Sequence, residues 1–113
     1  MTKVIYYTTD IDENPVKKFI DSLQKRDKAK IFRIFQNIEQ YGLLSILPHL
    51  KKLTETPFWE IRILGENNIR IIYLAISAES ILVLHGFLKK SQKTPIREIE
   101  IASKRLMDYK TRP

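Results

Sequence analysis

Residues 58–76 decide the fold; they read Phe-Trp-Glu-Ile-Arg-Ile-Leu-Gly-Glu-Asn-Asn-Ile-Arg-Ile-Ile-Tyr-Leu-Ala-Ile. Apolar and polar side chains alternate over 58–64, and this period of two predicts a half-buried strand. Residues 65–68 have the composition of a turn. Residues 69–76 are apolar on both faces apart from Arg70, which predicts a central strand. We therefore expect a hairpin whose second strand lies inside a sheet.

This hairpin predicts that two arginines face each other. Arg62 lies opposite Arg70 if the strands close over the turn, although directly opposed like charges destabilise a sheet unless something compensates. A third strand is expected over 81–88. After a connecting turn of two or four residues Arg70 and His85 share a face, whereas a three-residue turn would direct His85 to the other face. We prefer the register that places Arg62, Arg70 and His85 on one face.

The chain before the hairpin predicts one strand and two helices. Residues 3–8 are rich in β-branched and aromatic side chains, which favour a strand. Asn14-Pro15 marks a helix start, because asparagine caps free backbone amides and proline is tolerated at the first helical position. A second helix is expected from near Asp27 to a natural stop at Gly42. The short connection between the helices implies an antiparallel helical hairpin.

The remaining segments complete the expected chain order. Residues 43–50 are apolar but contain Pro48, and we interpret them as an ordered connector. Thr94-Pro95 is expected to cap and open a C-terminal helix. The order is β-α-α-β-β-β-α, an α+β fold in which an antiparallel sheet packs against the helical hairpin and the C-terminal helix. Residues 1–113 are expected to form one domain, since domains most often have ~100–150 residues.

The composition narrows the function classes. The 113 residues include 20 Lys and Arg against 13 Asp and Glu, and the net charge of +7 favours a polyanionic partner. The absence of cysteine excludes disulfides, cysteine-bound zinc and thiol catalysis. No apolar run approaches the ~18 residues of a membrane helix, and the N-terminus lacks the pattern of a secretory signal. We therefore expect a cytoplasmic protein with no membrane partner.

The expected basic cluster suits phosphoryl chemistry on RNA. Arg62 and Arg70 offer forked donors to a phosphate and can stabilise charge that develops in the transition state. His85 can transfer protons near neutral pH. RNA carries its own nucleophile, the 2′-OH, so we expect no metal and no cofactor. The lysines expected to bind the RNA backbone are Lys51, Lys52, Lys89, Lys90 and Lys93.

Several of these side chains have alternative roles that the sequence leaves open. Arg62 could pair with Glu60, which lies two residues away on the same face of the strand. His85 could be a hydrogen-bonded core histidine, in which case a lysine with a lowered pKa would be the base. The lysines could be solvated, and Phe58 and Trp59 are expected in the core rather than as platforms for base stacking.

Four segments of the chain together resemble a known family of toxins. They are residues 50–53, 58–62, 70–73 and above all 85–95, which read His-Gly-Phe-Leu-Lys-Lys-Ser-Gln-Lys-Thr-Pro. They resemble the phage-derived Gp49-like, HigB-type toxins of the RelE/ParE superfamily, and the resemblance extends over nearly the whole chain. It implies a compact RelE-like fold with the chain order given above.

The resemblance also implies an activity and partners. It implies the toxin of a type II toxin–antitoxin pair that cleaves mRNA, usually on the translating ribosome. A helix-turn-helix antitoxin of the HigA type is the expected partner, in a hetero-oligomer. Such toxins use no metal and no shared triad but varied basic residues on the concave sheet surface; the matching residues here are Arg62, Arg70, His85, Lys89, Lys90 and Lys93. Ile69 replaces an aromatic residue found in many relatives, which removes one candidate for base stacking.

Two other functions stay open. The ParE branch uses a similar scaffold to inhibit gyrase, so the fold alone does not fix the function. A degenerate toxin would only bind its antitoxin or RNA. The cluster of arginine and histidine favours RNA cleavage, because a gyrase inhibitor needs no acid–base group.

Overall fold

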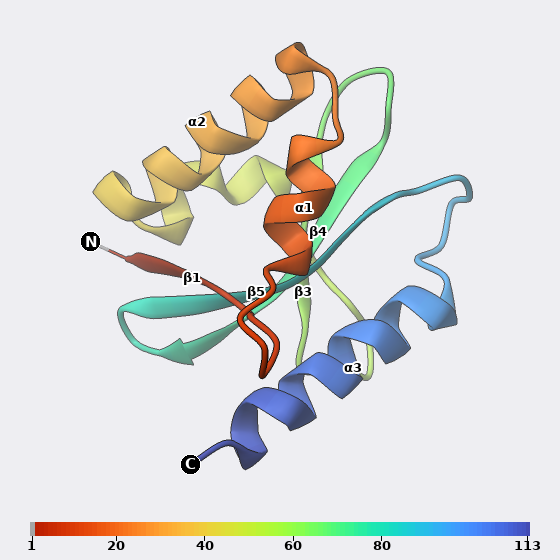
Figure 1. Cartoon of the computed structure of the whole chain (residues 1–113). Coiled ribbons are helices and arrows are strands. Elements are labelled where there is room, and N and C mark those ends of the chain that lie inside the picture. The colour runs from red at the N-terminus through yellow and green to blue at the C-terminus, as the bar shows by residue number, and fades with distance from the viewer. Residues whose placement is uncertain (1) are drawn as a thin grey trace.

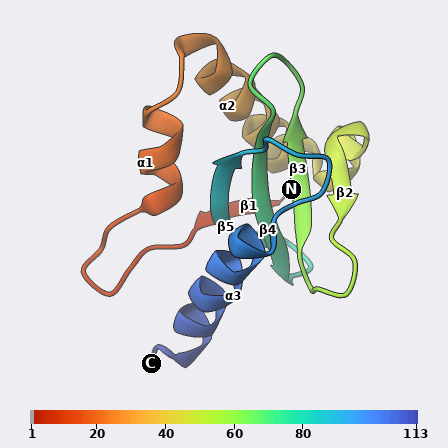
Figure 2. The same cartoon turned by 90° about the vertical axis from the view of Figure 1, so that its right-hand side faces the viewer.

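The computed structural model describes residues 2–113 and confirms the α+β class (Figure 1). A mixed sheet has the strand order β1-β5-β4-β3-β2. Helices α1 and α2 lie on one face of the sheet and α3 lies on the other; in Figure 2 α3 is in front of the sheet and α2 is behind it. The elements are β1 (Lys3–Tyr6), α1 (Pro15–Asp21), α2 (Lys25–Tyr41), the 3-10 helix η1 (Leu43–His49), β2 (Leu50–Lys52), β3 (Trp59–Ile63), β4 (Ile69–Ser77), β5 (Ser80–Leu88) and α3 (Ile96–Thr111).

The helices begin and end close to the predicted positions. The side chain of Asn14 accepts a hydrogen bond from the amide of Lys17 at 3.0 Å, with Pro15 in the first turn of α1. Helix α2 begins at Lys25, slightly before the expected start, and ends at Tyr41. Its C-cap residue is Gly42, whose φ of 83° is a conformation that favours glycine. No helix within residues 2–113 has the length and apolar character needed to cross a membrane.

Two features of the sheet differ from the sequence prediction. Strand β1 pairs in parallel with β5, so the sheet is mixed and not purely antiparallel. The expected connector over 43–50 is helical up to His49, and it leads into an additional strand, β2, which pairs with β3. A strand of three residues is too short to show a period of two, and the direction of β1 depends on the path of the chain through the helices. Neither feature therefore has a local signal in the sequence.

The central hairpin has the predicted register. Arg62 on β3 lies opposite Arg70 on β4. A two-residue turn joins β4 to β5, and Arg70 lies opposite Phe87. His85 is two residues from Phe87, and the two rings stack with their centroids 5.5 Å apart. Arg62, Arg70 and His85 therefore share one face of the sheet, as expected.

The two faces of the sheet carry separate apolar cores. Side chains of α1, α2 and η1 pack on one face with β3 and β4, and α3 packs on the other. Helix α3 contacts mainly β5 through residues that include Ala102 and Leu106. It therefore covers only part of its face. The corner of β3 and β4 that carries Arg62 and Arg70 remains partly exposed.

Gly86 on β5 permits the close approach of α1 to the sheet. A Cβ atom at this position would lie 2.5 Å from Cδ2 of Phe19, well inside van der Waals contact. We expect Gly86→Ala to lower the free energy of unfolding by about 1–3 kcal/mol, as overpacking usually does. The measurement is urea denaturation of the wild type and the variant.

A double-mutant cycle with Phe19→Leu is the control, because it removes the ring that the new methyl group would meet. Gly86→Ala should cost less in the Phe19→Leu background than in the wild type. An equal cost in both backgrounds would show that contact with Phe19 is not the reason for the glycine.

Candidate functional site

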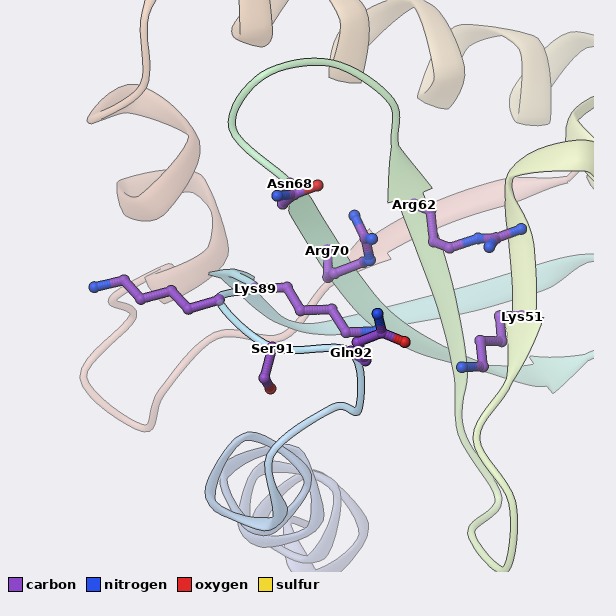
Figure 3. Close-up of a pocket in the computed structure, with 8 residues that line it drawn as sticks. Lys51, Arg62, Asn68, Arg70, Lys89, Ser91 and Gln92 are labelled. Atoms are coloured by element: carbon purple, nitrogen blue, oxygen red, sulfur yellow. The ribbon is translucent and has the colours of Figure 1, made fainter.

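A basic pocket of about 460 Å³ lies at the open corner of the sheet. Its walls come from β2, β3, β4 and the loop that follows β5 (Figure 3). None of the lining residues is acidic, and most are cationic, so the pocket can attract an anion. The lining residues are Lys51, Arg62, Asn68, Arg70, Lys89, Lys90, Ser91 and Gln92.

The two arginines enter the pocket from facing positions of neighbouring strands. Arg62 Nη2 donates to the carbonyl of Pro48 at 3.4 Å, and Arg70 Nη1 donates to the carbonyl of Ile69 at 3.0 Å. Both side chains are only partly buried, so their other terminal N–H groups can meet a ligand. Burial lowers the pKa of Arg70, Glu60 raises it and Arg62 lowers it again. Two guanidinium groups from facing positions of neighbouring strands suit a phosphate group that accepts hydrogen bonds from both.

Lys89 is held in the pocket by the turn before β4. Its backbone amide donates to the carbonyl of Asn68 at 2.9 Å, which ties the loop after β5 to that turn. Its side chain is 7% exposed, and Nζ lies 4.0 Å from Oε1 of Glu60. Burial lowers the pKa of Lys89, and of its charged neighbours Glu60 raises that pKa while Arg70, Lys51 and Arg62 lower it. Lys89 is therefore a titratable group inside the pocket with a weakened hold on its proton.

The other expected lysines lie in the same region. Lys51 and Lys90 line the basic pocket, whereas Lys52 and Lys93 line a neighbouring pocket of about 370 Å³. Lys51 contributes to both pockets, so the two adjoin. The structure thus gathers all five lysines around two adjacent openings. No group of three or more histidine, aspartate or glutamate side chains that could hold a metal ion occurs within the described residues.

His85 lies under α3 and lines neither pocket. Its Nε2 is 2.7 Å from Oε1 of Glu98, and Nη1 of Arg105 lies 3.2 Å from its Nδ1. A neutral ring that donates from Nε2 and accepts at Nδ1 satisfies both contacts. Burial lowers the pKa of His85, the hydrogen bond with Glu98 raises it and Arg105 lowers it. The lowering of this pKa comes from burial and Arg105, and not from the cations of the basic pocket.

The comparison with protein families concerns most of the chain. Residues 18–107 match the family described as phage-derived protein Gp49-like. The chain belongs to this Gp49-like family. The matched span contains every residue that lines the basic pocket, and membership is consistent with a role in a toxin–antitoxin pair. The search of curated proteins found no match.

The sequence pattern did not predict the environment of Glu60 in this Gp49-like protein. Its side chain is fully buried, and it pairs with Arg70 and not with Arg62: Arg70 Nε lies 3.5 Å from Glu60 Oε1. The hydroxyl of Thr94 donates to the other carboxylate oxygen, Oε2, at 2.6 Å. The prediction that Thr94 caps the last helix is therefore wrong, since Pro95 is the N-cap residue of α3 and no side chain caps it. The one sequence signal for Glu60 was the alternation over 58–64, which places it on the same face of the strand as Arg62.

The buried neutral His85 makes the stability of the Gp49-like fold depend on pH. Its pKa in the folded protein lies below the unfolded value of about 6.5, so the unfolded chain binds more protons in this window. Stability is full above about pH 6.5 and is lost as the pH falls from there toward the folded pKa. We expect the free energy of unfolding to decline over this window in the wild type, and His85→Gln to lack that part of the decline. Urea denaturation between pH 5 and pH 8 measures it, and equal slopes in both proteins would contradict the assignment.

Proposed function

We propose that this protein is the toxin of a type II toxin–antitoxin pair and cleaves mRNA on the translating ribosome without a metal ion. The observation that supports the proposal is the basic pocket, in which five cationic side chains and no acidic one surround a partly open space. A pocket of this volume falls in the range that accommodates small ligands such as one nucleotide. The net charge of +7 favours an RNA partner in the same way.

Each side chain has a proposed part in the cleavage. Arg62 and Arg70 bind the scissile phosphate and stabilise the charge that develops on its oxygens. The 2′-OH of the preceding nucleotide attacks phosphorus while a base accepts its proton. The bond from phosphorus to the 5′ oxygen breaks, and the departing 5′ oxygen takes up a proton from water. Lys89 is the base that the geometry favours, because it lies in the pocket and burial lowers its pKa. His85 is less well placed, because both of its ring nitrogens already face groups of α3.

The partners and the location form part of the same proposal. The neighbouring pocket with Lys52 and Lys93 would hold phosphates beside the scissile one. A helix-turn-helix antitoxin of the HigA type would neutralise the toxin in a hetero-oligomer. Both the ribosomal substrate and such a partner place the protein in the cytoplasm.

A translation reaction supplied with the purified protein tests the proposal. Cuts in the mRNA that are phased with codons are the expected result. Arrest of DNA gyrase without RNA cuts would instead support an inhibitor of the ParE kind. If the protein shows neither activity, it is a binding module that engages only its antitoxin or RNA. Gyrase arrest without RNA cuts and the absence of both activities each contradict the proposal.

Arg70→Ala should abolish growth arrest and lower the single-turnover rate of RNA cleavage by at least ~10²-fold, because the variant loses a donor to the scissile phosphate. Antitoxin binding should remain. Lys104→Ala is the matched control: it removes one positive charge from an exposed position on α3 and should leave the rate nearly unchanged.

His85→Gln in the same assay separates the two candidates for the base. We expect it to lose far less activity than Arg70→Ala. If a folded His85→Gln protein loses ~10²-fold or more of its cleavage rate, His85 and not Lys89 is the base. Full toxicity of a folded Arg70→Ala protein would remove Arg70 from the site.

A further inference from the structure

Glu60 places a buried carboxylate beneath a pocket for anions. Its side chain has no exposed surface, and it is the second residue of β3, opposite Lys51 on β2 and Ile72 on β4. A negative charge at this place reduces the positive potential that the pocket presents to a phosphate. Burying a carboxylate also costs free energy unless partners compensate for the lost hydration. On charge alone, Glu60 therefore works against RNA binding, which indicates a role other than attraction of the substrate.

The partners of Glu60 are parts of the pocket. Oε2 accepts the hydrogen bond from Thr94 at 2.6 Å, while Oε1 lies 3.5 Å from Arg70 Nε and 4.0 Å from Lys89 Nζ. Lys89 and Thr94 are the two ends of the loop whose intervening residues 90–92 line the basic pocket. One carboxylate thus contacts both ends of this loop and one of the two arginines.

The contact with Arg70 is electrostatic and not a closed hydrogen bond. Glu60 Oε1 and Arg70 Nε are both buried without a hydrogen-bond partner, and their 3.5 Å separation exceeds the ~2.7–2.9 Å of a charge-assisted hydrogen bond. Arg70 therefore turns its Nε edge toward Glu60 and its Nη1 toward the backbone carbonyl of Ile69. The attraction sets the direction of the side chain without using its terminal donors.

We propose that Glu60 is a positioning residue that fixes Arg70, Lys89 and the loop over 89–94 in the arrangement that receives the scissile phosphate. Thr94 acts with it, because its hydroxyl orients the carboxylate and ties the start of α3 to the pocket. The inference rests on the proposed ribonuclease function for its catalytic consequence. Its structural consequence, an ordered loop, holds without any substrate.

The same carboxylate acts on the protonation of Lys89. The charged groups that face Lys89 are Glu60 and Arg62 on β3, Arg70 on β4 and Lys51 on β2. Glu60 is the one acid among these four groups, and it raises the pKa of Lys89. Removing its charge leaves burial and three cations, all of which lower that pKa. The limb of the pH–rate profile that reports Lys89 should then move to lower pH.

Three variants and one control separate positioning from charge. Glu60→Gln removes the charge but keeps the shape and an oxygen that Thr94 can reach. Thr94→Val removes the hydroxyl and keeps the carboxylate, whereas Thr94→Ser keeps both. Glu79→Gln makes the same change of charge in the exposed turn between β4 and β5. The measurements are the single-turnover cleavage rate, the affinity for an RNA oligomer blocked by 2′-O-methylation, and amide hydrogen exchange over 89–94.

The expected result is a loss of rate without a loss of binding. Glu60→Gln should bind the blocked RNA as tightly as the wild type or more tightly, while its cleavage rate falls by ~10–10²-fold through misplacement of the reacting groups. Thr94→Val should show the same fall and Thr94→Ser should restore most of the rate. Amides of the loop should exchange faster in Glu60→Gln and Thr94→Val, and Glu79→Gln should match the wild type throughout.

Three results would overturn the inference. The first is a rate that rises together with RNA affinity in Glu60→Gln, since Glu60 would then only reduce the charge of the pocket. The second is unchanged hydrogen exchange over 89–94, and the third is equal behaviour of Thr94→Ser and Thr94→Val. If Glu60→Gln does not fold, the Thr94 pair decides, because both of its members keep the carboxylate. A wild type that cuts no RNA would refute the proposed function alone, because the exchange data still test the positioning.

Discussion

Arg62 and Arg70 stand directly opposite each other on β3 and β4, and their mutual repulsion has to be offset within the sheet. The buried carboxylate of Glu60 attracts Arg70, and the carbonyl of Pro48 accepts a hydrogen bond from Arg62. The offset is partial, since Nε atoms of both arginines are buried without hydrogen bonds. A phosphate between the two side chains would relieve the remaining repulsion. An anion bound there would therefore stabilise the pair, as the proposed phosphate site requires.

The two apolar cores explain why this pair is accessible. Helices α1 and α2 bury one face of the sheet, and Gly86 permits α1 to lie close to β5. Helix α3 covers the other face mainly along β5, where His85, Glu98 and Arg105 join it to the sheet. The corner of β3 and β4 beyond the start of α3 is left for the basic pocket. The loop over 89–94 connects β5 to α3. It therefore forms one wall of the pocket and also holds the N-terminus of α3.

Local patterns were sufficient for some parts of the fold and of the site. The alternation over 58–64 and the length of the turns predicted that Arg62 and Arg70 oppose each other, and Asn14 and Gly42 predicted helix ends by their own chemistry. The alternation of side chains along the strands also predicted which face carries His85. It cannot predict how much of that face a helix covers. The cover of α3 over His85, the burial of Glu60 and its bond with Thr94 all depend on where α3 docks. That position is a tertiary property with no short-range signal, as is the parallel pairing of β1.

The proposed cleavage depends most on the use of the 2′-OH of RNA as the nucleophile in the basic pocket. The chemistry of the cut ends tests this claim directly, in a translation reaction with the wild-type protein and a message that carries a single 2′-deoxynucleotide at a mapped cut site. We predict a 5′-hydroxyl and a 2′,3′-cyclic phosphate at the cuts in the unmodified message, and no cut at the 2′-deoxy position. Ends with a 5′-phosphate, or undiminished cutting of the 2′-deoxy message, would contradict the account.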